Sequence, residues 1–281
     1  GWRPDEPATV WWVVALDGGG AGRAATERDA LESWTAPFDQ PPKRLWHSEL
    51  RFSDVTWGDA HTALVSEWWF ADRRTRTWRI DPGNTGVAPI VVWDRSYQDD
   101  YGDPGFPVTE PGPFGRAVLR RTPTGGLLLS GAGIAPDGVH PFLDRFEWTA
   151  TTRIWQAKDP YQEEVVEVLD DLGREILTWR ESQTEVPNLW RRKTGNSRGP
   201  ARDGRAVQAL TAFPDWAPAF ASVRKEVVRY ERSDGLPLSA TVYFPPGYDP
   251  VRDGPRPALF WVYPNEFRHR SDAGQVKAPT N

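Results

Sequence analysis

The amino-acid sequence predicts a mainly β protein that begins with a partial β-propeller and continues into a second domain. Two observations predict the propeller: a unit of about fifty residues recurs along the chain, and each copy divides into short strands joined by turns. The chain also contains sixteen tryptophans, most of them in short β-like runs, where aromatic side chains pack well on a pleated sheet. A change of pattern near residue 224 predicts where the second domain begins.

The repeated unit is clearest in its last strand, which is apolar, contains a tryptophan and is followed by a charged turn. Three copies, PKRLWHSE, APIVVWDRS and TTRIWQAKD, contain Trp46, Trp93 and Trp155. In a fourth copy, AVQALTAFPD, Phe213 replaces the tryptophan. The spacing predicts about three to four blades of four antiparallel strands. A β-sandwich with long hairpins is the structural alternative.

The strands before each of these last strands follow in the same order. Residues 8–38 resemble an earlier blade that is cut at its start. Further strands are expected in three groups, at 54–59, 62–70 and 75–81, at 117–126, 127–133 and 141–149, and at 164–173, 174–182 and 188–195. Glycine and aspartate occupy the turns, because they tolerate the backbone dihedrals of a hairpin. We therefore expect residues 1–222 to form the C-terminal blades of a propeller.

Residues 223–281 follow a different pattern. The pair Asp234 and Gly235 predicts a hairpin turn between two strands. The run ALFWVYP, residues 258–264, is continuously apolar, which is typical of a strand buried on both faces of a mostly parallel sheet. No long amphipathic helix follows before Asn281. The sequence therefore predicts a second domain that has started but is not finished.

Composition and charge exclude several classes of function. The net charge is −5 and acidic and basic residues are interleaved, so we expect no nucleic-acid partner. No run of about eighteen apolar residues offers a membrane span. Cysteine is absent, and the four histidines lack the spacing of metal ligands, so we expect no metal site. Nothing in the sequence implies another cofactor. The histidines are His47, His61, His140 and His269.

The chain contains no methionine, so we expect its N-terminus to be processed, cut or missing. The sequence leaves the cellular compartment and the oligomeric state open.

Ser197 lies in the pentapeptide GNSRG, which matches the G-x-S-x-G pattern of a hydrolase nucleophile. Such a serine needs a buried apolar strand before it and a helix after it. The preceding LWRRKTG is mostly polar, and Pro200 and Gly204 prevent a helix from following. We therefore predict that Ser197 is a loop residue without a catalytic role, and that His269 is a solvated side chain.

Several long motifs resemble a known family. YERSDGLPLSATVYFPPGYDP, DGPRPALFWVYPNEF and DAGQV resemble the start of the hydrolase domain in prolyl oligopeptidase-type serine peptidases, in the glutamyl endopeptidase branch. GWRPDEPATVWWV, ALVSEWWFADRRTRTW, DRSYQDDYGDPGFP and LLLSGAGIAPDGVHPFLDRF are similar to the propeller of that branch. The motifs occur in the same order and span nearly the whole chain.

The resemblance implies a β-propeller that limits access to an α/β-hydrolase domain, of which residues 223–281 would be the first strands. It also implies a Ser-Asp-His triad beyond Asn281, so this chain alone is expected to be inactive. Tyr263 occupies the position from which the family donates a hydroxyl to the oxyanion hole, although the same tyrosine could simply pack at a strand end. A preference for acidic residues requires a cation for the substrate carboxylate, and arginine provides bidentate geometry. The candidates are Arg73, Arg74, Arg76, Arg268 and Arg270.

The parent protein is thus expected to be a serine peptidase that acts on peptide or protein substrates, after glutamate or aspartate. One alternative is a non-catalytic propeller that binds peptides or proteins. Another is a hydrolase of small esters or acyl peptides.

Overall fold

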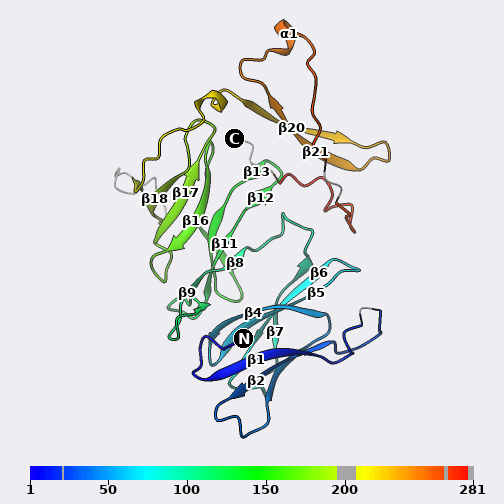
Figure 1. Cartoon of the computed structure of the whole chain (residues 1–281), viewed down its shortest axis with the longest axis vertical. Helices are drawn as coiled ribbons and strands as arrows, with labels where there is room; N and C mark the ends of the chain where they lie inside the picture. The colour runs from blue at the N-terminus through cyan, green and yellow to red at the C-terminus, as the bar shows by residue number, and fades with distance from the viewer. Residues whose placement is uncertain (21, 195–206, 263–264, 278–281) are drawn as a thin grey trace. The chain divides into compact units, whose positions relative to one another are not determined.

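The computed structural model describes residues 1–20, 22–194, 207–262 and 265–277 (Figure 1). In this part of the chain the regular structure is almost entirely β, apart from the 3-10 turn η1 (Pro218–Phe220) and the short helix α1 (Pro250–Asp253). None of the helices in these ranges is long or apolar enough to cross a membrane. The mainly β fold predicted from the sequence is therefore confirmed.

The chain divides into two compact units, each with its own internal contacts. Unit 1 comprises Gly1–Tyr97, Pro107–Leu128 and Glu147–Ala150, and unit 2 comprises Gln98–Phe106, Leu129–Phe146 and Thr151–Asn281. The domain boundary predicted between residues 222 and 223 falls inside unit 2 and stays a prediction.

Four-stranded sheets with the strand order of propeller blades recur along the chain. The first contains β4 (Arg51–Asp59), β5 (Thr62–Trp69), β6 (Arg74–Ile80) and β7 (Ile90–Ser96), paired in sequence order and antiparallel. Another runs in order β16 (Gln162–Val168), β17 (Glu175–Glu181), β18 (Asn188–Lys193) and β19 (Val207–Ala209), also antiparallel. Between them in sequence lies a sheet of order β15-β14-β11-β8, from β15 (Thr151–Gln156), β14 (Phe142–Phe146), β11 (Leu127–Gly131) and β8 (Phe106–Pro107).

The opening sheet has three strands, β1 (Thr9–Ala15), β2 (Asp29–Thr35) and β3 (Lys43–Ser48). Trp2 forms an antiparallel bridge to Val10 along the free edge of β1.

The predicted last strands are confirmed. Trp46 lies in β3, Trp93 in β7 and Trp155 in β15, and each of these strands is at one end of its sheet. In the sheet β16-β17-β18-β19 the end strand is β19, and Phe213 lies just beyond it. The tryptophan pattern therefore predicted where each meander ends.

One predicted blade strand pairs differently. Within residues 117–126, only β10 (Ala117–Leu119) is a strand, and it pairs with β9 (Thr109–Pro111). In the sheet β15-β14-β11-β8 the edge strand next to β11 is β8 instead. The Val108 amide, just after β8, donates to the Leu128 carbonyl at 2.8 Å. The edge of β11 is thus shared: Arg121 forms an antiparallel bridge to Leu127, as the sequence predicted, whereas residues 106–108 pair with β11 beyond that bridge. A separate short hairpin joins β12 (Ile134–Ala135) to β13 (Gly138–Val139).

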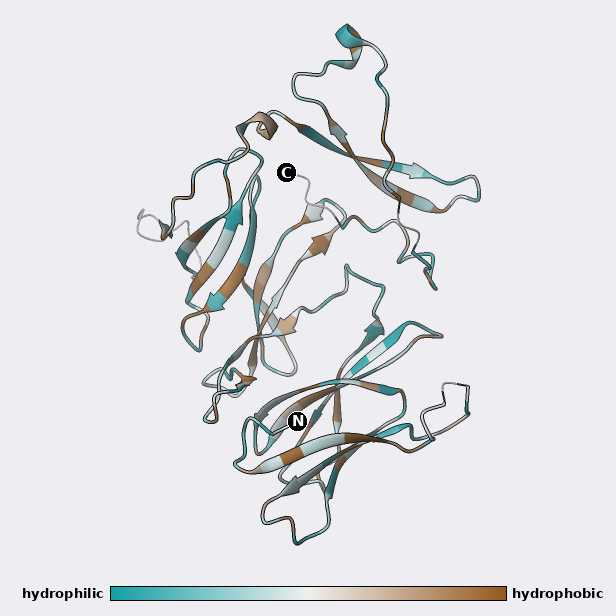
Figure 2. Cartoon of the chain, viewed as in Figure 1, coloured by the Kyte–Doolittle hydropathy of each residue, from teal (hydrophilic) through white to brown (hydrophobic). Residues whose placement is uncertain are grey.

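The core of unit 1 lies between the opening sheet and the sheet β4-β5-β6-β7. It contains Leu31, Leu45, Trp46, Val55, Trp57, Ala63, Val65 and Ile80. The Trp11 and Trp57 rings lie 6.0 Å apart in a tilted arrangement, so the aromatic pairs add specific contacts to the buried area. Figure 2 shows hydrophobic and hydrophilic residues interleaved along these strands, as a sheet with one covered face requires.

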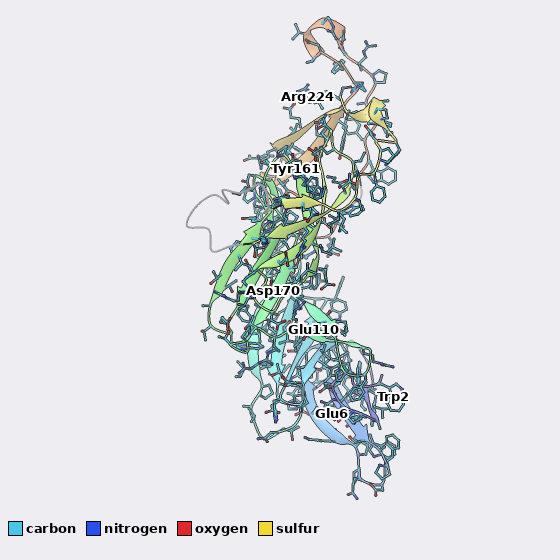
Figure 3. The ribbon with its side chains drawn as sticks, turned by 90° about the vertical axis from the view of Figure 1, so that its left-hand side faces the viewer. Trp2, Glu6, Glu110, Tyr161, Asp170 and Arg224 are labelled. Carbon is cyan, nitrogen blue, oxygen red and sulfur yellow. The ribbon has the colours of Figure 1, made fainter. Side chains whose placement is uncertain are left out.

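Turn residues predicted from the sequence have the expected geometry. Gly235 has φ 74°, and the Asp234 carboxylate accepts from the Leu236 amide, closing the hairpin between β20 (Arg224–Glu231) and β21 (Pro237–Phe244). In unit 2, Asp170 closes the turn after β16 in the same way, by accepting from the Glu175 amide at 2.7 Å. Figure 3 labels Tyr161 and Asp170, which lie at the two ends of β16.

The apolar strand predicted at residues 258–264 is wrong for its described part, residues 258–262. These residues form neither helix nor strand, and Leu259 and Trp261 are 95% and 92% exposed. A strand of this kind is stable only when neighbouring strands satisfy its backbone and other elements cover its faces. No strand of the described chain pairs with it.

Candidate functional site

Two residues that the sequence singled out, Tyr263 and Ser197, lie outside the residues that the structure describes. The oxyanion role of Tyr263 and the loop position of Ser197 therefore stay predictions. The geometry around the candidate arginines is described, and it separates them into engaged and unengaged side chains.

Arg73 and Arg74, at the tip of the β5–β6 hairpin, are both engaged within unit 1. Arg74 forms a bidentate pair with Asp94 of β7, with distances of 2.7 Å and 2.5 Å. The Arg74 guanidinium holds the pKa of Asp94 below its usual range. Arg73 is buried, donates to the Phe70 carbonyl, and lies 3.7 Å from the centroid of the Phe70 ring. Binding a substrate carboxylate would require either side chain to leave these partners.

Arg76 is bound to two carboxylates. Its guanidinium lies 2.8 Å from Glu49 and 3.0 Å from Glu67. Glu67 is fully buried and also accepts from the Trp78 indole at 2.9 Å and from the Leu50 amide at 2.8 Å. A carboxylate is stable in such a place only when it is paired and hydrogen-bonded, so this cluster supports the sheet. The sequence analysis missed Glu67, although an acid inside the apolar run ALVSEWW was a usable signal.

Arg268 and Arg270 lie in unit 2, in the segment 265–277. Arg270 donates to the Gly235 carbonyl in the β20–β21 turn. Arg268 is exposed, and its side chain has no hydrogen bond or ion pair to the part of the chain that the structure describes. Its main-chain amide, in contrast, donates to Oε1 of Gln98 at 2.9 Å. Among the candidate arginines, Arg268 is thus held by its backbone while its guanidinium faces solvent.

The contacts between the segment 265–277 and the loop 98–101 were not foreseen. Gln98 donates to the Glu266 carbonyl at 2.5 Å and accepts from the Arg268 amide. Gln275 accepts from the Asp100 amide at 2.8 Å and donates to the Asp99 carboxylate at 2.9 Å. The loop 98–101 had been singled out only within the motif DRSYQDDYGDPGFP, and the segment 265–277 for the motif DAGQV and the candidates Arg268 and Arg270, without any indication that the two stretches meet.

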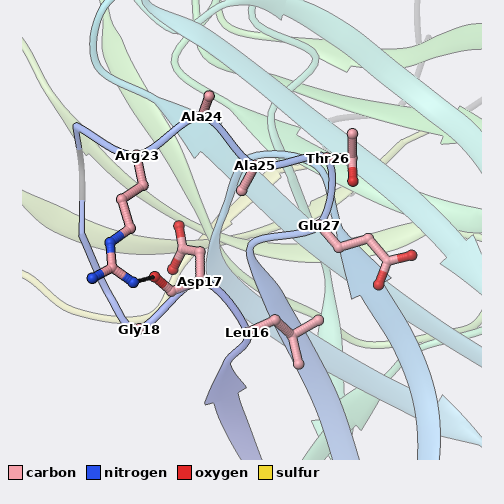
Figure 4. A pocket seen from close by; sticks show the side chains of 8 residues that line it. All are labelled: Leu16, Asp17, Gly18, Arg23, Ala24, Ala25, Thr26 and Glu27. Carbon is pink, nitrogen blue, oxygen red and sulfur yellow. Dashed lines mark hydrogen bonds between the residues drawn. The ribbon is translucent and has the colours of Figure 1, made fainter.

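Figure 4 shows a hollow in the loop between β1 and β2. Arg23 folds back over it and donates to the main-chain oxygen of Asp17 at 3.0 Å. The Asp17 carboxylate is bound by Arg51 at 2.6 Å and by Arg28 at 3.2 Å, and the hydrogen bond from Arg51 lowers its pKa. The lining contains neither a serine nor a histidine: Leu16, Asp17, Gly18, Arg23, Ala24, Ala25, Thr26, Glu27. This hollow therefore offers no serine nucleophile paired with a histidine base.

Residues 1–20, 22–194, 207–262 and 265–277 contain no group of three or more histidine, aspartate or glutamate side chains placed to hold a metal ion.

Two solved peptidase structures align with most of this chain at low identity. A dipeptidyl peptidase 4 from Porphyromonas gingivalis matches 79% of this chain and 35% of its own, with 12% identity and a TM-score of 0.44. Oligopeptidase B from Trypanosoma brucei matches 86% of this chain and 38% of its own, with 9% identity and a TM-score of 0.42. TM-scores below 0.5 do not establish a common arrangement of elements.

Sequence comparison is more informative. No family model matches the chain. A probable chloroplastic glutamyl endopeptidase of Arabidopsis thaliana is 39% identical over 302 aligned residues, which cover 100% of this chain and 30% of the relative. A protein of the same description from Oryza sativa subsp. japonica is 39% identical and covers 100% of this chain and 31% of the relative. The chain is therefore similar over its whole length to these glutamyl endopeptidase-like proteins and spans about 30% of theirs.

Proposed function

We propose that this chain is part of a serine peptidase that hydrolyses peptide bonds after glutamate or aspartate. The observation that carries the proposal is the 39% identity, over the whole chain, to two proteins described as probable glutamyl endopeptidases. In this proposal residues 1–222 are propeller blades that limit access to the active site. Residues 223–281 are the first strands of an α/β-hydrolase domain, and the catalytic serine, aspartate and histidine lie outside residues 1–281.

Tyr263 is the residue of this chain that would contact the reacting atoms. A hydroxyl aimed at the tetrahedral oxyanion stabilises charge that develops only in the transition state. The resemblance supports this role, because Tyr263 directly follows the apolar run 258–262 as an oxyanion donor follows its strand, although this run is not a strand in the described structure.

Arg268 is the arginine that fits best with binding the acidic side chain of a substrate. Arg73, Arg74, Arg76 and Arg270 would each have to give up an existing partner. The Arg268 guanidinium has no such partner in the described chain, so pairing with a substrate carboxylate costs it no existing contact.

The test uses the full-length protein that contains this chain. A fluorophosphonate probe is expected to label it at a serine outside residues 1–281, and to leave residues 1–281 alone unlabelled. In a panel of glutamyl, alanyl, prolyl and acyl-aminoacyl substrates, the glutamyl substrate is expected to have the highest kcat/KM. Tyr263→Phe is expected to lower kcat by about 10²–10³-fold, as loss of one oxyanion donor does.

The controls separate the alternatives. Covalent labelling of Ser197 would contradict the proposal, because it would place the nucleophile inside this chain. Peptide binding without labelling or hydrolysis would favour a non-catalytic binding propeller. Preference for an ester or acyl peptide would keep the hydrolase and change its substrate. Arg268→Ala should lower kcat/KM for the glutamyl substrate more than for the alanyl one, and an equal loss would exclude Arg268 as the carboxylate ligand.

A further inference from the structure

The segment 265–277 is buried in part, although it contains no helix or strand. Within the described residues after Phe244, only Asp272, Ala273, Gln275 and Val276 are buried, with Gln275 9% and Val276 3% exposed. Within the segment, the Asp272 amide donates to the His269 carbonyl at 3.1 Å, and other backbone groups find partners outside it. Several of those partners belong to the loop 98–101.

Gln98 binds the backbone of this segment at two points. Its side-chain nitrogen donates to the Glu266 carbonyl, and its side-chain oxygen accepts from the Arg268 amide at 2.9 Å. One carboxamide therefore pairs with the chain as a neighbouring β-strand would, through one donor and one acceptor. Two bonds from a planar group fix both the position and the direction of residues 266–268.

Gln275 makes the reciprocal arrangement from the other side. Its side-chain oxygen accepts from the Asp100 amide, and its side-chain nitrogen donates to the Asp99 carboxylate. The Val276 amide donates to the Tyr101 hydroxyl at 2.9 Å, and the Lys277 ammonium binds the Asp100 carboxylate. Each stretch thus contributes one glutamine that binds the backbone of the other.

Gly274 brings the same segment close to β21. Its φ is 76°, and a Cβ there would lie 2.2 Å from the Pro237 carbonyl. Any other residue would combine an unfavourable left-handed backbone with a clash against main chain. The segment therefore contacts both β21 and the loop 98–101.

We propose that Gln98 and Gln275 are positioning residues that hold the segment 265–277, and with it the backbone of Arg268, in the place that acidic substrate recognition requires. The two reciprocal glutamine contacts carry the inference. It rests on the proposed function, because Arg268 matters in this way only in a peptidase that selects acidic residues. The contacts themselves can be tested without any activity.

The first experiment measures amide hydrogen exchange in the full-length protein. Gln98→Ala is expected to speed exchange of the Arg268 amide by about three- to tenfold, the change expected from losing one hydrogen bond. Gln275→Ala is expected to do the same at Asp100. Gln208→Ala is the matched control, because Gln208 is exposed on β19, and it should change neither amide. Unchanged exchange at both amides in the two variants would overturn the proposal.

The second experiment measures kcat and KM on glutamyl and alanyl substrates that differ only in that residue. Gln98→Ala and Gln275→Ala are expected to lower the glutamyl-to-alanyl ratio of kcat/KM by about fivefold or more. The loss should come mainly from a higher KM for the glutamyl substrate. The thermal unfolding midpoints of both variants should stay close to that of Gln208→Ala. If the two glutamines had only a structural role, kcat/KM would fall equally for the glutamyl and the alanyl substrate.

The outcomes distinguish the two proposals. Faster exchange together with an unchanged glutamyl-to-alanyl ratio would overturn the positioning role and leave the proposed function intact. Absence of hydrolysis by the unmodified protein would overturn the proposed function and the positioning role together. Faster exchange in both variants and a selective loss on the glutamyl substrate would establish the inference.

Discussion

The sheet β4-β5-β6-β7 and the hairpin β20–β21 are built from similar residues but differ in what covers them. In β5, Thr62–Val65 and Glu67 are buried, and the strand contributes Ala63 and Val65 to the core of unit 1. In β20, the sequence RKEVVRYE forms an equally regular antiparallel ladder, yet none of its side chains is buried. Both strands have the β-branched and aromatic residues that favour a pleated sheet. Strand formation is therefore not a measure of how strongly a region is held.

The same contrast explains the apolar run 258–262. It is more hydrophobic than most of the core strands, but no described strand pairs with it and its side chains are exposed. The segment 265–277 is less hydrophobic, and it is nevertheless partly buried because two glutamines bind it to the loop 98–101. In this region, placed hydrogen bonds decide the position of the chain more than apolar character does.

The largest expected difference between the two regions concerns their glutamates. Glu67→Ala removes a fully buried carboxylate, leaves the Trp78 indole and the Leu50 amide without their acceptor, and takes from the buried Arg76 one of its two ion-pair partners, which should cost about 3–5 kcal/mol of unfolding free energy. Glu226→Ala in β20 is the matched change, and its exposed pair with Arg224 should cost less than about 1 kcal/mol. Urea denaturation of both variants measures the difference. Equal midpoints would contradict the comparison.

Leucine substitutions should give a slightly smaller contrast. Leu31→Ala opens a cavity in the core of unit 1 and should destabilise the protein by about 2–5 kcal/mol. Leu259→Ala removes the same atoms from a side chain that is 95% exposed, so its effect should stay within about 0.5 kcal/mol. The check is the shift of the urea midpoint at unchanged m-value. A large loss in Leu259→Ala would mean that the run 258–262 is buried in solution.

The smallest effect is expected from a surface ion pair, and it depends on pH. Arg74 lowers the pKa of Asp94 below its ordinary value of about 3.9, so the pair stabilises the fold while Asp94 is ionised. That contribution is fully present above about pH 4 and is lost as the pH falls through the lower folded-state pKa. The stability gap between the unmodified protein and Asp94→Asn should therefore be constant at neutral pH and close on acidification.

The hairpin provides the control for this pair. Asp234 also has a lowered pKa, through Arg232, but these two residues are only two positions apart. Part of that pair can form in the unfolded chain, so Asp234→Asn should show a smaller gap. A gap for Asp94→Asn that widens on acidification would contradict the assignment, since it would require a raised pKa.

Short-range features of this protein follow from the sequence. Alternation with a period of two residues and the turn chemistry of Asp234 and Gly235 depend only on neighbouring residues, and so did the position of Trp46, Trp93 and Trp155 on the last strands. The resemblance to glutamyl endopeptidases was also visible, because long motifs occur in the same order. Tyr263 was found in this way, and its geometry stays a prediction.

Pairings over long distances were beyond such patterns. Gln98 and Arg268 are 170 positions apart, and neither residue type indicates a partner by itself. The edge of β11 was assigned entirely to residues 117–126, but these residues pair with β11 only through the bridge from Arg121 to Leu127. Several extended segments compete for one row of backbone donors and acceptors, and only the folded arrangement selects among them. The run 258–262 was predicted to be buried because its hydrophobicity is a property of the sequence. Burial depends instead on which other segments cover it, and that is a property of the folded chain.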